Sequence, residues 1–177
     1  IMRVPIVQRM ILAETPEDRR AAVDRLRPFQ EGDFEGIFRA MAGLPVTIRL
    51  LDPPLHEFLP SLLDLAVQVE RARAKGKPDP ELERQLVRVQ QLHEINPMLG
   101  TRGCRLGIEM PEIYRMQVAA IMSAACTVAD ETGHPPIVEI MIPLVGFEEE
   151  LRRMRELVVE EAERVLEQRG TRVDYLV

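Results

Sequence analysis

Two short, uninterrupted apolar runs limit the folds that are open to this chain. The first, Leu44–Leu51, is bounded by Gly43 and Pro53, and the second extends from Ile137 to Val145. Runs of this length without polar alternation are typical of strands that are buried on both faces of a parallel sheet. We therefore predict two such strands, joined by helical crossovers because parallel strands cannot be connected by a tight turn.

Helical patterns fill the segments around these runs. They predict helices over about residues 16–26, 32–41, 61–75, 80–93, 111–133 and 147–168. Residues 3–10 are expected to be extended, and Pro28 is expected to end the helix that Thr15 caps. A third strand should begin at Arg172. This alternation of strands and helices predicts an α/β fold with right-handed βαβ units.

The predicted architecture is part of a barrel. A closed (β/α)8 barrel needs about 250 residues, whereas this chain has 177 and contains two or three firm strand patterns. We expect a partial (β/α)8 TIM-type barrel with parallel strands, in which a pair of helices over about residues 61–94 is an insertion. Residues 1–177 would then form a fragment of one domain, since the length does not suggest a second.

Composition excludes several classes of partner. The chain has 23 basic and 29 acidic side chains, a net charge of −6, and no run of Lys or Arg interleaved with aromatic residues, so we expect no nucleic acid. No apolar run approaches the roughly 20 residues of a membrane span, and no signal-peptide pattern is present. We expect a cytoplasmic protein without a membrane partner. Cys104 and Cys126 have no CxxC spacing, so both are predicted to be free thiols.

Metal and nucleotide motifs are also missing from the sequence. The pairs His56–Glu57 and His93–Glu94 lack the second histidine of an HExxH helix. The glycines between residues 100 and 107 form neither a GxGxxG pattern nor a P-loop. We therefore assign no metal ligand and no nucleotide cradle to these residues.

Arg49 and Arg102 are the candidate ligand-binding residues. Arg49 stands where the first apolar run ends, and the carboxyl ends of parallel strands line the ligand site of α/β proteins. A guanidinium can bind a phosphate or carboxylate through two parallel hydrogen bonds. The residues alone favour ordinary ion pairing, because spacing cannot show that the two positions meet. Asp52 is expected either to pair with an arginine or cap a turn, or to position Arg49; Arg105 is a weaker candidate.

Three segments resemble the pyruvate, phosphate dikinase family. They are GDFEGIF at 32–38, IRLLDPPLHEF at 48–58 and NPMLGTRGCRLG at 96–107. The resemblance covers nearly the whole chain and implies the phosphoenolpyruvate/pyruvate-binding barrel of that family. It implies that Arg49 and Arg102 hold the phosphate and carboxylate of phosphoenolpyruvate and that Arg105 orients its loop. Phosphoenolpyruvate synthases and enzyme I of the sugar phosphotransferase system share the arginines but carry different flanking sequences.

The resemblance also implies a reaction. Dikinases are phosphotransferases that interconvert ATP, phosphate and pyruvate with AMP, pyrophosphate and phosphoenolpyruvate through a phosphohistidine. The implied cofactor is Mg²⁺, with ligands outside this chain, and the implied partners are a nucleotide-grasp domain and a phosphohistidine domain. The family's metal-binding glutamate and proton-donating cysteine have no counterpart in these residues. We therefore expect an excised segment with no catalytic residue and no activity by itself.

Two alternatives remain open. The chain is either such a segment or a stand-alone, non-catalytic half-barrel that serves as a binding or assembly module, and enzyme I is a less favoured third reading. A partial barrel exposes the edges of its sheet and part of its apolar interior. We therefore expect the chain to self-associate into a homo-oligomer.

Overall fold

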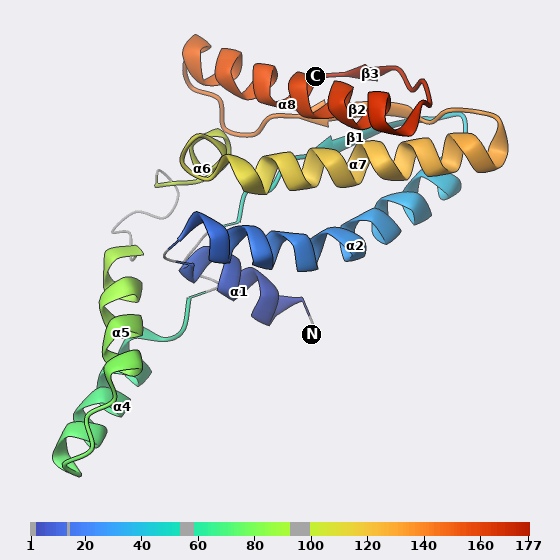
Figure 1. The fold of residues 1–177 in the computed structure, drawn as a ribbon. Coiled ribbons are helices and arrows are strands. Elements are labelled where there is room, and N and C mark those ends of the chain that lie inside the picture. The colour runs from blue at the N-terminus through green and yellow to red at the C-terminus, as the bar shows by residue number, and fades with distance from the viewer. Residues whose placement is uncertain (1–2, 14, 54–58, 93–99) are drawn as a thin grey trace.

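The computed structural model of the chain describes residues 3–13, 15–53, 59–92 and 100–177. The interpretations of His56, Glu57, His93 and Glu94 lie outside these residues. The elements run in the order α1 (Val4–Leu12), α2 (Pro16–Ala40), β1 (Pro45–Arg49), α4 (Leu62–Ala74), α5 (Pro80–Leu92), α6 (Cys104–Glu109), α7 (Pro111–Thr132), β2 (Ile137–Met141), α8 (Glu148–Arg169) and β3 (Tyr175–Leu176) (Figure 1). The molecule is a mixed α/β structure in which helices predominate.

The three strands form one parallel sheet in the order β1-β2-β3. Pro45 lies opposite Ile137 and Arg49 opposite Met141, and β3 pairs with β2 through Val138 and Tyr175. Helical structure connects β1 to β2 and β2 to β3, so that the chain re-enters the sheet in the same direction. The predicted parallel sheet is therefore confirmed, with β1 and β2 inside the two predicted runs and β3 beginning at Tyr175 rather than Arg172. The described residues form no closed barrel, and the partial barrel stays a prediction.

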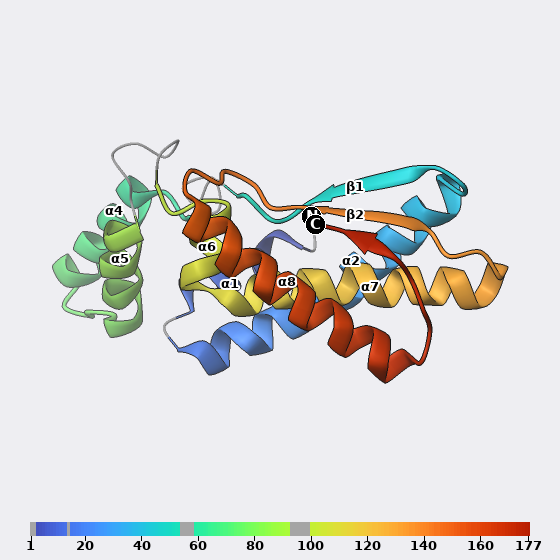
Figure 2. The same ribbon diagram turned by 90° about the horizontal axis from the view of Figure 1, so that it is seen from above.

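Only one face of this sheet is covered by described elements. Val138 and Ile140 of β2 point toward the helices and are buried, whereas Ile137 and Met141 are about half exposed on the other face. Figure 2 shows α2, α7 and α8 on the same side of the sheet. The prediction of strands buried on both faces is therefore wrong within the described residues, because nothing among them packs on the second face.

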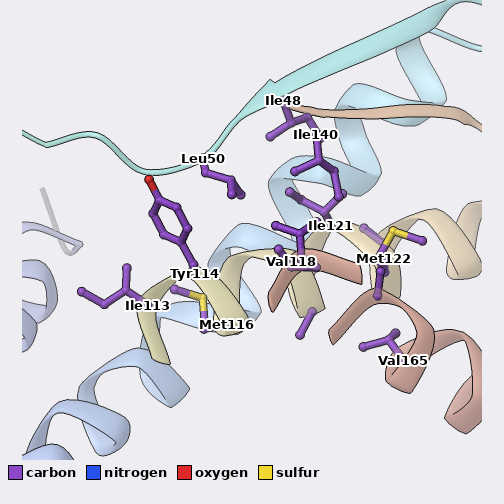
Figure 3. Packing of buried hydrophobic residues seen from close by; sticks show 14 of the residues in the cluster. Ile48, Leu50, Ile113, Tyr114, Met116, Val118, Ile121, Met122, Ile140 and Val165 are labelled. Carbon is purple, nitrogen blue, oxygen red and sulfur yellow. The ribbon is translucent and has the colours of Figure 1, made fainter. Parts of the chain in front are cut away.

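Helix α7 is the centre of the core. It lies between α2, α8 and the sheet, and most of its residues are buried on every side. Ile121 and Met122 fill the space between the sheet and α8, as Figure 3 shows. Pro111 begins the helix and Gly133, in a left-handed conformation with φ +73°, ends it. Both boundaries agree with the prediction, because Pro suits the first helical turn and Gly suits a left-handed C-terminal cap.

Pro28 does not end a helix as predicted. The helix α2 continues through it to Ala40, and so absorbs the separate helix expected from residue 32. A proline inside a helix costs about 3 kcal/mol because it removes a donor and crowds the preceding turn. Apolar packing on both sides of the proline offsets this cost, because Val23, Leu26 and Phe38 are buried in the same core as α7. Two ion pairs with α7 add to this packing: Arg19 binds Glu112 at 2.7 Å, and Arg39 binds Glu131 at 2.9 Å.

The first residues of the chain are helical rather than extended. Helix α1 begins with a proline in its first turn and buries Ile6, Met10 and Ile11. The spacing of Ile6 and Met10 is the i, i+4 spacing of one helix face, so the sequence did contain the signal. The extended prediction for residues 3–10 is wrong because the apolar residues serve packing against α2 rather than sheet pairing.

The predicted helical pair is present as α4 and α5. These helices pack against each other and stand apart from the sheet (Figure 1). The last long helix, α8, ends at Gly170 with φ +67°, as predicted. Helix α6 was not predicted, because it is only one and a half turns long and contains Gly107. No helix in the described segments is long and apolar enough to cross a membrane.

Candidate functional site

The backbone at the end of β1 is held by a buried side chain of α7. The amide of Gln117 donates to the carbonyl oxygen of Arg49 at 3.3 Å, and its oxygen accepts from the N–H of Leu51 at 2.7 Å. The N–H of Leu50 continues the sheet by donating to the carbonyl oxygen of Met141 at 2.9 Å. Gln117 thus satisfies the backbone groups at the point where the chain leaves the sheet, and this sets where Arg49 and Asp52 project.

Arg49 and Arg102 come together on one carboxylate. The Nε of Arg102 donates to Oδ1 of Asp52 at 3.1 Å, and its Nη2 donates to Oδ2 at 3.2 Å. Arg49 donates to the same Oδ2 through its own Nη2. The sequence expectation that Asp52 pairs with an arginine is met twice, and the two candidate arginines, 53 positions apart in the chain, share one partner.

The three side chains differ in exposure. Only 6% of the Asp52 side chain is exposed, compared with 15% for Arg102 and 54% for Arg49. Among the described residues, these two guanidinium groups share one carboxylate at this edge of the sheet. Among the described residues, Arg49 is engaged through Nη2 only, so its remaining donors face water. Such an arrangement suits an anionic ligand that approaches from the side of Arg49.

Arg105 lies outside this cluster and holds the loop that follows β2. Its Nε binds Oε1 of Glu150 at 3.1 Å. The other oxygen of Glu150 accepts from the N–H groups of Gly146 at 2.8 Å and Phe147 at 3.1 Å. These hydrogen bonds hold the pKa of Glu150 below its usual value, and the bond from Gly146 contributes most. Arg105 therefore ties α6 to the start of α8 and does not reach the pair of arginines.

A close contact between backbones positions Arg102. Gly103 has φ +53°, and a Cβ atom there would lie 2.8 Å from the carbonyl oxygen of Pro143. Next to it, Cys104 donates its N–H to that oxygen at 3.0 Å and its thiol to the carbonyl oxygen of Leu144 at 3.3 Å. The loop after β2 thus holds the residues beside Arg102. Cys104 is a free thiol, as predicted; it is fully buried, and burial raises its pKa.

Sequence reasoning missed two residues beneath the cluster. Gln117 and Tyr114 both lie on α7 and are buried. The signal for Gln117 was a polar residue within the apolar stripe of a helix, which indicates a buried hydrogen bond. Nothing in the sequence singled out Tyr114, because a tyrosine at this position fits an ordinary core.

Metal ligands do not gather near the arginines. Across residues 3–13, 15–53, 59–92 and 100–177, no three His, Cys, Asp or Glu side chains are placed to hold a metal ion. One cavity of about 700 Å³ is lined mainly by α1, α2 and α5, and another of about 540 Å³ is lined by α5. A cavity of about 910 Å³ lies between α8 and β3. Neither Arg49 nor Arg102 lines any of these three. Within the described residues, Arg49 lies at an edge of the sheet with 54% of its side chain exposed.

Comparison with known proteins identifies related chains. Pyruvate, phosphate dikinase 1 of Arabidopsis thaliana is 51% identical over 176 residues, and pyruvate, phosphate dikinase of Clostridium symbiosum is 44% identical over 173 residues. The dikinase of Rhizobium meliloti (strain 1021) is 47% identical over 175 residues. These matches cover 98–99% of this chain but only 18–19% of the relatives.

The resemblance seen in the three sequence segments is therefore confirmed along almost the whole chain. A family described as PEP-utilising enzyme, PEP-binding domain, where PEP is phosphoenolpyruvate, matches residues 5–176. That range includes the sheet, the arginines and the helices that position them. The chain belongs to the PEP-binding domain family of the PEP-utilising enzymes.

Proposed function

We propose that this chain is part of the PEP-binding domain of a pyruvate, phosphate dikinase, and that Arg49 and Arg102 bind PEP. The parent enzyme would be a phosphotransferase that interconverts ATP, phosphate and pyruvate with AMP, pyrophosphate and PEP. One observation carries the proposal for the site: two arginines from distant segments meet on Asp52 at the carboxyl edge of parallel strands. The names of the relatives, all three of them dikinases, support the proposal for the enzyme.

The chemistry of PEP fits this edge. PEP carries a phosphate and a carboxylate on a three-carbon frame, and each group accepts the paired hydrogen bonds that a guanidinium offers. Arg49 is exposed and presents donors to water, whereas Arg102 is held more deeply by Asp52. We assign the buried Asp52 the task of keeping the two guanidinium groups adjacent, so that they repel each other less before a ligand arrives.

The wider assignments are part of the same proposal. Residues 1–177 would belong to one barrel domain, working with the nucleotide-grasp and phosphohistidine domains of the dikinase in a homo-oligomer. Arg105 would orient the loop of Arg102. Magnesium would serve the whole enzyme, but the donor sets of the described residues do not fit a magnesium site, so we assign no step through the ion to this chain.

Calorimetric titration of PEP into the chain tests the site. We expect measurable binding that weakens at least about tenfold in Arg49→Ala and in Arg102→Ala, a difference of about 1.4 kcal/mol. Arg153→Ala is the matched control, because the Arg153 side chain is 56% exposed, slightly more than the 54% of Arg49, and likewise pairs with one carboxylate among the described residues.

The outcomes separate the roles of the residues. Equal weakening in all three variants would reduce the effect to general electrostatics and overturn the assignment of Arg49 and Arg102. Binding that survives both site substitutions would place PEP elsewhere. Wild-type chain that binds no PEP at all would contradict the proposal that this edge is a preformed binding site.

A further inference from the structure

Tyr114 carries a buried polar group that the fold does not explain. The side chain is fully buried in α7, and its hydroxyl has no hydrogen-bond partner among the described residues. Leaving a buried polar group unpaired costs about 1–3 kcal/mol, and most native structures avoid it. Phenylalanine would fill the same space without that cost. The hydroxyl therefore calls for a role beyond packing.

The ring of Tyr114 is fixed so that its hydroxyl cannot turn to water. A Cβ atom at Gly107 would lie 2.6 Å from Cδ2 of the ring and 2.7 Å from the Sδ of Met154, so the ring packs directly on the α6 backbone. Figure 3 shows the hydroxyl directed at the chain that follows Leu50. That chain leads to Asp52. Burial chiefly, and then the nearby Cys104 and Asp52, raise the pKa of Tyr114, so the hydroxyl keeps its proton and is available to donate.

Asp52 is the nearby acceptor that would lose a hydrogen-bond donor when a ligand draws Arg49 away. Without ligand, its carboxylate accepts from Arg49 and Arg102. An anion that draws the Arg49 guanidinium away from Asp52 removes one of these donors from a carboxylate that is only 6% exposed. A buried carboxylate that loses a partner is strongly destabilised unless another donor replaces it.

We propose that Tyr114 is a positioning residue whose hydroxyl donates to Asp52 when an anionic ligand draws Arg49 away. The Asp52 carboxylate then turns toward the hydroxyl, which replaces the lost donor, while Asp52 continues to bind Arg102 and so keeps it aligned for the ligand. The ligand-free chain carries the cost of the unpaired hydroxyl, and the ligand-bound chain recovers it. This inference rests on the proposed binding of PEP by Arg49 and Arg102 and adds a residue that lies beneath the site.

Tyr114→Phe should move stability and binding in opposite directions. We expect the ligand-free variant to have an equal or higher melting temperature, because it loses an unpaired buried hydroxyl while the ring still packs. We expect PEP to bind roughly tenfold more weakly, as for loss of a hydrogen bond to a charged group. A purely structural tyrosine would give unchanged affinity, since Phe restores the packing, and that result would overturn the proposal.

A second measurement needs no ligand. The chain has two tyrosines and no tryptophan, so in a Tyr175→Phe background the near-ultraviolet absorption comes mainly from Tyr114. Adding Arg49→Gln removes one donor from Asp52, and the Tyr114 band should move to longer wavelength as its hydroxyl begins to donate. Arg153→Gln in the same background is the control and should leave the band in place.

The two measurements distinguish the failure of this inference from that of the proposed function. If the wild-type chain fails to bind PEP but the absorption band still moves with Arg49→Gln, the proposed function fails and the proposed hydrogen bond from Tyr114 to Asp52 stands. The opposite result is that PEP binds the wild-type chain and binds the arginine variants more weakly, while the absorption band stays fixed and Tyr114→Phe binds PEP normally. The proposed role of Tyr114 is then wrong and the proposed function stands.

Discussion

Helix α7 and the α4–α5 pair are regular helices of the same chain, yet different forces hold them. Helix α7 is buried on nearly every side and carries Gln117 and Tyr114 beneath the arginines. The α4–α5 pair buries few side chains, and its ion pairs lie in water, where a pair contributes about 0–1 kcal/mol. Stability and the placement of the site should therefore depend on the same helix, while the pair tolerates change.

The largest expected effect comes from cutting a core side chain of α7. Ile121 is fully buried, so Ile121→Ala should lower the free energy of unfolding by about 2–5 kcal/mol through lost burial and a cavity. Leu63 of α4 is 74% exposed, and Leu63→Ala should change the free energy of unfolding by less than about 0.5 kcal/mol. Urea denaturation measures both. Similar losses in the two variants would remove the distinction between the regions.

A smaller loss is expected where α6 meets α7. Gly107→Ala forces a methyl group to within 2.6 Å of the Tyr114 ring, and this overpacking should cost about 1–3 kcal/mol. Gly32 lies inside α2, and among the described residues nothing outside the helix backbone lies within 4 Å of where a Cβ atom would be. Gly32→Ala should therefore stabilise the chain by about 0.5–1 kcal/mol. Thermal denaturation of the two variants should give shifts of opposite sign, and shifts of the same sign would contradict the packing described for Tyr114.

Gln117→Met tests the support of the strand end. Methionine fills a similar volume but leaves the carbonyl of Arg49 and the N–H of Leu51 without their partner, which should cost about 1–3 kcal/mol. Binding of PEP should also weaken, because Arg49 is no longer aimed. Gln168→Met, which removes a surface hydrogen bond from Arg164, is the control. Normal PEP affinity in Gln117→Met would show that Arg49 does not depend on this support.

The smallest effect concerns pH and the loop after β2. The pKa of Glu150 is lower in the folded chain than its usual value of about 4.3. Its contribution to stability is therefore present above that value and is lost as the pH falls through the lowered folded pKa. Urea midpoints between pH 6 and 3 should fall less steeply in Glu150→Gln than in the wild-type chain. Parallel curves would mean that the bonds of Glu150 do not contribute to folding.

Local sequence signals predicted elements whose ends are marked by glycine or proline. The first strand lies inside the predicted run, and α7, α8 and the α4–α5 pair begin and end within a few residues of their expected positions. Such boundaries follow from backbone preferences that act over neighbouring residues. Pro28 shows the limit of these signals, because packing of α2 along α7 outweighs a strong local preference.

The candidate site was predictable only in part. Arg49 and Arg102 could be chosen because they lie in segments that resemble one family, and Asp52 was expected to pair with an arginine. That both arginines share Asp52 could not be derived from their spacing. The uncovered face of the sheet was likewise not predicted, because a continuous apolar run indicates packing on both faces and does not show which elements supply it.

The sequence by itself determined the parallel α/β pattern, the approximate boundaries of α4, α5, α7 and α8 and, through its motifs, the membership of the PEP-binding domain family. Only the tertiary structure decided that Arg102 lies on Asp52, 50 positions away, that Gln117 holds the end of β1, and that the hydroxyl of Tyr114 beneath them has no partner among the described residues. The physical reason is one of range. Backbone preferences and helical periodicity act between near neighbours, whereas these contacts exist only after α7 has packed against the sheet.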